Sequence, residues 1–194
     1  GIVSFDGKNF HSERRLGLVG DNFTKGKVIE NLVGNNAIGH NRYSTTGDTS
    51  LKNIQPFFAD LHVGGISLAH NGNLTNALQI REKLIKDGSI FQSTSDTETI
   101  VQLIAKSKRE KMEEKIVDAL FQIKGGYALV ILTNNELIGV RDPFGIIVES
   151  FERSKLKTYC GLLFGIVITS LIMFSGAPRA LLQLFVPLFV PRKV

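Results

Sequence analysis

The sequence predicts an antiparallel α+β fold built in layers. Strand-like runs near both ends of the first 146 residues flank a block of helical patterns. Two of these runs, residues 127–133 and 136–141, are joined by Asn134-Asn135, a pair typical of a β-hairpin turn. The chain has 194 residues, of which 43% are hydrophobic and 21% charged, so it is long enough and apolar enough to bury a core. These observations favour the layered arrangement over an alternating βαβ one.

The first 58 residues alternate short apolar runs with polar turns. Pro56 fixes an extended or turn geometry near the end of this region. The predicted elements are a strand at 1–5, a turn at 6–9, a second apolar run at 16–19, a polar helix or turn at 22–35, a strand at 37–40 leading into a polar loop at 41–47, and a crossing segment at 53–58.

The central stretch is an apolar run at residues 65–69 that stops abruptly at His70-Asn71-Gly72-Asn73. Gly72 permits a positive φ or a close approach by a ligand, and Asn71 brings two amide donors. Donors held at the end of a strand can stabilise an oxyanion in acyl-transfer chemistry. The alternative is an Asn-Gly hairpin turn, which this stretch alone favours.

Three helical patterns follow this stretch. Thr75 or Asn76 caps the first, which ends at Asp87-Gly88, the expected place of a glycine C-cap. Ser95 and Glu98 form an S-x-x-E capping box before the second. Apolar positions at helical spacing are Leu78, Ile80, Leu84 and Ile85 in the first pattern, residues 100–104 in the second, and Ile116, Val117, Leu120 and Phe121 in the third, which spans 112–124.

Charge and cysteine content exclude several classes of protein. Residues 1–147 carry 17 Lys and Arg against 16 Asp and Glu, so they form no basic stripe for nucleic acid, and the basic pI arises mainly from residues 148–194. The single cysteine, Cys160, excludes a disulfide framework and a cysteine-based metal site. The four histidines lack metal-ligand spacing, and residues 1–5 contain no secretory signal.

The character of the sequence changes near the C-terminus. Residues 159–178 carry no charged side chain, and residues 161–174 are almost wholly apolar. Basic residues flank this run, as they would flank a membrane span over about 161–178. The alternatives are a buried strand or helix of a larger core, or an apolar tail produced by a frame shift.

Four polar clusters lie at the ends of predicted elements, at residues 42–47, 70–73, 95–98 and 141–145. Each alone is consistent with a turn, a helix cap or a surface ion pair. Together they supply a guanidinium for a carboxylate, a carboxylate for an ammonium group, and donors for an oxyanion. A site that holds an α-amino acid by both ends needs such a pair, and Arg42 and Asp96 are the candidates.

The clusters belong to a series of motifs that resembles a known family. The runs are Leu-Gly-Leu-Val at 16–19, Ile-Gly-His-Asn-Arg-Tyr-Ser-Thr-Thr-Gly at 38–47, Asn-Ile-Gln-Pro-Phe at 53–57, Leu-Ala-His-Asn-Gly-Asn-Leu at 68–74, Thr-Ser-Asp-Thr-Glu at 94–98 and Gly-Val-Arg-Asp-Pro-Phe-Gly-Ile at 139–146. In this order they resemble the glutamine amidotransferase domain of the amidophosphoribosyltransferases, over residues 1–146. The run at 42–47 is more similar to these purine enzymes than to glucosamine-6-phosphate synthase, asparagine synthetase or glutamate synthase.

The resemblance implies an N-terminal-nucleophile hydrolase-like αββα sandwich of two antiparallel sheets between helical layers. It also implies glutamine hydrolysis, with ammonia passed to phosphoribosyl pyrophosphate at a second domain in the first step of purine nucleotide synthesis. By position, Arg42 would hold the glutamine carboxylate and Asp96 its α-ammonium group. Asn71 and Gly72 would form the oxyanion hole, and Tyr43, Thr45 and Asn73 would shape the pocket.

Departures from the family lead to further expectations. The family's nucleophile is an amino-terminal cysteine, which residues 1–146 lack, and Cys160 lies in the apolar tail outside every matching motif. We therefore expect an incomplete domain that is inactive alone, followed at 147–194 by an unrelated apolar tail. The rival hypothesis is a non-catalytic, membrane-tethered glutamine-binding protein.

Partners and location follow from the same resemblance. We expect no cofactor in this chain, and Mg²⁺ only in the phosphoribosyltransferase domain that it lacks. The expected partners are glutamine and phosphoribosyl pyrophosphate, with no nucleic acid, and the full-length family implies a homo-oligomer. The expected location is the cytoplasm, or a membrane if residues 161–178 insert.

Overall fold

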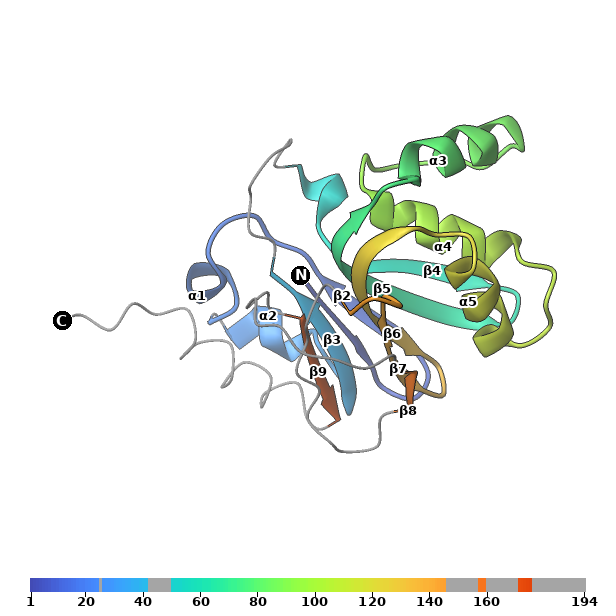
Figure 1. The fold of residues 1–194 in the computed structure, drawn as a ribbon. Helices are drawn as coiled ribbons and strands as arrows, with labels where there is room; N and C mark the ends of the chain where they lie inside the picture. The colour runs from blue at the N-terminus through green and yellow to red at the C-terminus, as the bar shows by residue number, and fades with distance from the viewer. Residues whose placement is uncertain (25, 42–49, 146–156, 160–170, 176–194) are drawn as a thin grey trace.

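Two β-sheets lie face to face in the computed structural model, and helices cover the outer face of each (Figure 1). The structure describes residues 1–24, 26–41, 50–145, 157–159 and 171–175. The layers therefore run helix, sheet, sheet, helix, and the predicted α+β sandwich is confirmed.

The smaller sheet has four strands in the order β2-β1-β3-β9, all paired antiparallel. Alternation along these strands buries both faces. Val3 and Phe5 point to the second sheet, whereas Ile2 packs on the helical side with Phe23 and Leu32. The elements are β1 (Ile2–Phe5), β2 (Phe10–Glu13), β3 (Asn36–His40) and β9 (Leu171–Ser175), with the short helices α1 (Val19–Asn22) and α2 (Gly26–Glu30) outside.

The larger sheet has five strands in the order β4-β5-β6-β7-β8. Its pairs are antiparallel except the last, in which β8 runs parallel to β7. The strands are β4 (Phe57–Leu61), β5 (Gly64–Leu74), β6 (Gly125–Thr133), β7 (Leu137–Arg141) and β8 (Lys157–Tyr159), and the 3₁₀ turn η1 (Leu51–Asn53) precedes β4. The hairpin predicted at Asn134-Asn135 joins β6 to β7, as expected.

Three helices cover the outer face of the larger sheet (Figure 1). They are α3 (Ala77–Lys86), α4 (Asp96–Lys106) and α5 (Met112–Leu120). Ile100 and Ile104 of α4 pack on Leu68 and Ile131 of the sheet in the largest hydrophobic cluster. Helix α4 is largely buried, because its apolar residues recur at helical spacing on the side that packs on the sheet.

The strict alternation of β5 decides which way each site residue points. Ile66 and Leu68 pack toward the helices, whereas Ala69 packs between the sheets with Ile38 and Val130. Even-numbered side chains of β5 therefore face α4, and odd-numbered ones face the smaller sheet.

Strand β5 is longer than predicted. It continues through Leu74, so both interpretations of residues 70–73, a strand end and an Asn-Gly hairpin turn, are wrong. The reason is tertiary: β6 places Ala128 opposite Asn71 and Gly125 opposite Leu74, which gives this segment a partner strand. Gly72 takes a φ of 119°, so the positive φ expected there is confirmed.

Other elements differ in detail. Strand β2 was not predicted, and α5 ends at Leu120 rather than 124. Ser95 caps α4 by accepting from the Thr97 N–H, as predicted. The capping box is wrong in its second half, because the Glu98 carboxylate accepts from Gln92 and Ser93 instead.

The C-terminal expectations fall largely outside the described residues. Two described pieces beyond residue 146 are strands, β8 and β9, and each joins the edge of one sheet. Among the described residues, no helix has the length and apolarity needed to cross a membrane. The remainder of the run at 161–178 lies outside what the structure describes.

Candidate functional site

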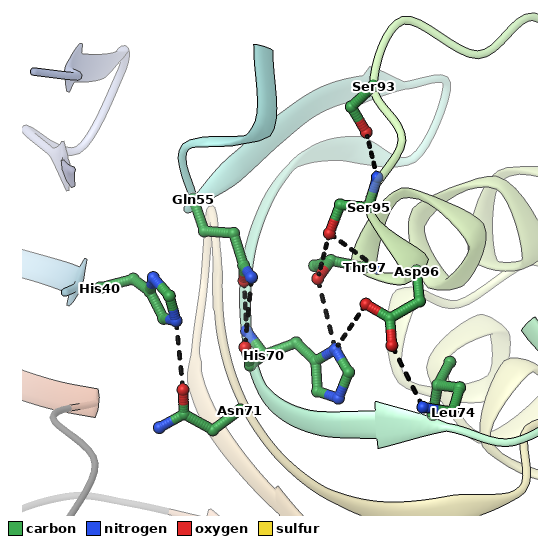
Figure 2. A network of polar contacts seen from close by, with 9 residues as sticks. All are labelled: His40, Gln55, His70, Asn71, Leu74, Ser93, Ser95, Asp96 and Thr97. Carbon is green, nitrogen blue, oxygen red and sulfur yellow. Dashed lines mark hydrogen bonds and ion pairs between the residues drawn. The ribbon is translucent and has the colours of Figure 1, made fainter. Parts of the chain in front are cut away.

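The candidate site lies where β5 extends past the beginning of β4. The pairing of the two strands starts with Phe57 opposite Leu68. Beyond it, residues 70–74 keep β6 along one edge but have no β4 residue along the other. Side chains from other parts of the chain occupy that second edge (Figure 2).

Gln55 takes the place of a neighbouring strand at His70. Its Oε1 accepts from the His70 N–H at 2.6 Å, and its Nε2 donates to the His70 carbonyl oxygen at 3.2 Å. Both residues are buried. One side-chain amide therefore satisfies both backbone groups of the residue immediately before Asn71, and this holds the strand in place.

Asp96, the first residue of α4, reaches the same edge four residues further on, at Leu74. Its Oδ2 accepts from the Leu74 N–H at 3.1 Å, and its Oδ1 lies 3.5 Å from Nδ1 of His70. Figure 2 shows the carboxylate between the two groups. The Asp96 side chain is 24% exposed, so the carboxylate is held by the protein and still reaches solvent.

Burial works against ionisation of Asp96, but its neighbours outweigh this effect. The hydrogen bond and electrostatic attraction from the His70 ring, together with the Leu74 and Thr97 amides, hold the Asp96 pKa below its ordinary value. Asp96 is therefore a carboxylate at neutral pH, ready to accept a cationic ligand group.

Asn71 points the other way, toward the smaller sheet. Its Oδ1 lies 3.1 Å from Nε2 of His40, at the end of β3. With the hydrogen on Nε2, His40 donates to the Asn71 oxygen and turns the amide nitrogen to the opposite side (Figure 2). A contact between the two sheets thereby sets the orientation of the Asn71 amide.

Gly72 and Asn73 are exposed although both are paired with β6. Gly72 has a φ of 119°, which residues with a side chain rarely adopt, so glycine is needed here. Exposed backbone at the end of an otherwise buried strand is accessible to a ligand.

A second layer of contacts holds the start of α4. The buried Glu98 carboxylate accepts from the N–H groups of Gln92 and Ser93 and from the Ser93 hydroxyl, at 2.6–2.8 Å. Asn53 donates through Nδ2 to Thr94 Oγ1 at 2.9 Å and accepts through Oδ1 from the Thr94 N–H at 3.0 Å. These bonds tie the loop before α4 to the helix and to η1, and they position Asp96.

The structure brings four of the predicted site residues, Asn71, Gly72, Asn73 and Asp96, to one end of β5. The other three, Arg42, Tyr43 and Thr45, lie outside the described residues. Within the described ranges, no group of three or more His, Cys, Asp and Glu side chains is arranged to hold a metal ion.

Sequence reasoning did not assign roles to His40, Gln55 or His70. His40 and His70 each follow directly on an apolar run, and Gln55 lies between Ile54 and Pro56. All three belong to motifs on which the resemblance rests. A buried polar side chain needs a partner, so this placement was the available signal. The partners themselves are 15 to 31 residues away and could not be read from spacing.

Comparisons with known proteins show the family of the chain. Residues 40–152, more than half of the chain, match the family model described as the glutamine amidotransferase domain. The chain therefore belongs to the glutamine amidotransferase domain family.

Within that family, its relatives are amidophosphoribosyltransferases. The enzyme of Rhizobium etli is 51% identical over 146 residues, which cover 75% of this chain and 29% of the relative. That of Methanocaldococcus jannaschii is 44% identical over 161 residues, which cover 82% of this chain and 34% of the relative. The chain thus spans about a third of the length of these relatives.

Solved structures show the same domain. Glutamine phosphoribosylpyrophosphate amidotransferase from B. subtilis, complexed with ADP and GMP, superposes with a TM-score of 0.68 at 38% identity. A structure described as the allosteric regulatory enzyme of purine biosynthesis gives 0.70 at 39%. Each match covers 75% of this chain and 31% of the other. The fold is therefore that of their glutaminase domain, an N-terminal-nucleophile hydrolase fold.

Proposed function

We propose that residues 1–146 form the glutamine-binding part of a glutaminase site. In the whole protein this site would release ammonia from glutamine for transfer to phosphoribosyl pyrophosphate, in the first step of purine nucleotide synthesis. The names of the similar enzymes support the reaction. One observation carries the proposal: an ionised Asp96 lies beside the exposed backbone of β5, next to Asn71 and Gly72.

The two ends of an amino acid require opposite charges. Asp96 would accept the α-ammonium group, because its pKa is lowered and its side chain still reaches solvent. Arg42 would pair with the α-carboxylate through its planar guanidinium. Tyr43, Thr45 and Asn73 would line the pocket around the glutamine side chain.

Attack on the glutamine amide places a negative charge on the carbonyl oxygen, and the site has donors for it. Asn71 would donate through its amide nitrogen, on the side away from His40. The N–H groups of His70 and Leu74 both point to the open edge of β5. Because alternate residues of a strand point the same way, the Gly72 N–H between them is expected to point there too.

The nucleophile is a separate matter. The 194 residues contain one cysteine, Cys160, which lies beyond the part of the chain matched to the family model. We therefore propose that this polypeptide binds glutamine without hydrolysing it.

Calorimetric titration of the 194-residue chain with L-glutamine and with glutaramic acid, which lacks the α-amino group, tests the assignment. The chain should prefer glutamine. Asp96→Asn should weaken glutamine binding by about 10-fold or more, because a hydrogen bond between charged groups contributes about 1.5–3 kcal/mol. It should leave the affinity for glutaramic acid nearly unchanged.

Asp60→Asn is the matched control, because it removes the same charge from an exposed position of β4. Absence of glutamine binding by the wild-type chain would overturn the proposal. So would an Asp96→Asn variant that still prefers glutamine to its des-amino analogue.

A further inference from the structure

His70 is a buried histidine that contacts Asp96 without reaching the exposed part of the site. Its side chain is 1% exposed. It faces α4, and both of its backbone groups are bonded to Gln55. Gln55 therefore holds the backbone of His70, and the ring is enclosed on the side that faces α4.

The surroundings of the ring indicate which nitrogen carries the hydrogen. Nδ1 lies 3.3 Å from Thr97 Oγ1 and 3.5 Å from Asp96 Oδ1, and both oxygens can accept (Figure 2). Nε2 is buried and has no hydrogen-bond partner among the described residues. A hydrogen on Nε2 would be a buried, unsatisfied donor and would leave the Nδ1 lone pair facing a carboxylate. The neutral ring with the hydrogen on Nδ1 avoids both costs.

Hydrogen bonds between Ser95 and Thr97 support the same assignment of the Nδ1 hydrogen. The Ser95 hydroxyl donates to Thr97 Oγ1 at 3.0 Å and accepts from the Thr97 N–H at 3.3 Å. Thr97 Oγ1 is thus fixed where it can accept from His70. The ring is held between two acceptors at the start of α4, and Asp96 is one of them.

We propose that His70 is a positioning residue that fixes the Asp96 carboxylate for the ammonium group of the ligand. The Leu74 N–H holds Oδ2, the His70 Nδ1–H holds Oδ1, and together they set the plane of the carboxylate. The Asp96 side chain is 24% exposed, so an ammonium group can reach the carboxylate held in this way. His70 itself does not touch the ligand. This inference rests on the proposed function.

Substitution of His70 separates positioning from packing. Leucine has a side chain of similar size but no hydrogen-bond donor. In asparagine, the Nδ2 group can occupy the place of the histidine Nδ1. His70→Leu should weaken glutamine binding roughly 3- to 10-fold, the loss expected for one hydrogen bond. Glutaramic acid should bind His70→Leu as it binds the wild type, because it has no ammonium group.

His70→Asn should restore most of the preference for glutamine. His62→Leu, at an exposed position next to β4, is the matched control and should change neither affinity. If His70→Leu does not fold, His70→Asn alone decides, since retained preference supports positioning and lost preference overturns it.

The outcomes distinguish this inference from the proposed function. If the wild-type chain does not bind glutamine, both are overturned. If it binds glutamine and Asp96→Asn abolishes the preference, the proposed function holds. If His70→Leu weakens the binding of glutamine and of glutaramic acid equally, or weakens neither, only the positioning role of His70 is overturned.

Discussion

Replacing Gln55 by leucine tests how the end of β5 is held. The Gln55 amide makes both hydrogen bonds of the His70 backbone, at 2.6 and 3.2 Å, where β4 provides no partner. Leucine has a similar volume and no polar atom. The substitution therefore leaves a buried N–H and a buried carbonyl group without partners and changes little else.

The expected loss follows from these two groups. Each buried backbone group left unsatisfied costs about 1–3 kcal/mol, and part is recovered by the apolar leucine, so the free energy of unfolding should fall by about 2–4 kcal/mol. In a chain of this length, such a loss lowers the melting temperature by about 5–15 °C. Glutamine binding should weaken as well, because Asn71 follows directly on the released residue.

Urea unfolding followed by circular dichroism measures the effect. Gln122→Leu is the control, because the exposed Gln122 side chain donates one bond to the Asp118 carbonyl oxygen at 3.0 Å. That exposed substitution should change stability by at most about 0.5 kcal/mol. If Gln55→Leu loses no more than Gln122→Leu, Gln55 does not act as the missing strand and the reasoning fails.

Two further predictions concern the carboxylates of α4. Glu98→Gln places an amide group where three donors converge, so the free energy of unfolding measured in urea should fall by about 1.5–3 kcal/mol. The loss should exceed that of Glu82→Gln on the exposed side of α3, and equal losses would contradict the role given to Glu98. Because the pKa of Asp96 is lowered in the folded chain, its contribution to stability is complete above the ordinary value of about 4 and is lost as pH falls through the lower folded value. The stability difference between the wild type and Asp96→Asn should therefore shrink as the pH falls below about 4, and a difference independent of pH would be evidence against this.

Local patterns were enough to predict much of the scaffold. The amphipathic helices α3, α4 and α5 were located because apolar residues at helical spacing need one buried face. The hairpin between β6 and β7 follows from Asn134-Asn135 between two apolar runs, and the Ser95 cap from the preference of serine for that position. The order and composition of the six motifs were also sufficient to identify the family.

The end of β5 shows where local reasoning fails. Asn71-Gly72 has the composition of a turn, yet it lies inside an eleven-residue strand. Partner residues on β6, more than 50 positions away, supply the pairing that overrides the local preference. Glu98 is a similar case, since a local box was available but the loop at Gln92 and Ser93 presents more donors to the carboxylate.

The sequence by itself thus determined the fold class, the main helices and the family, and it singled out Asn71 and Asp96 as site candidates. Only the tertiary structure decided how these residues are held. His40 meets Asn71 across two sheets, Gln55 replaces a strand, and His70 meets Asp96 at the start of a helix. The physical reason is that each contact satisfies a buried polar group with a partner distant in the chain, and sequence spacing carries no record of such pairs.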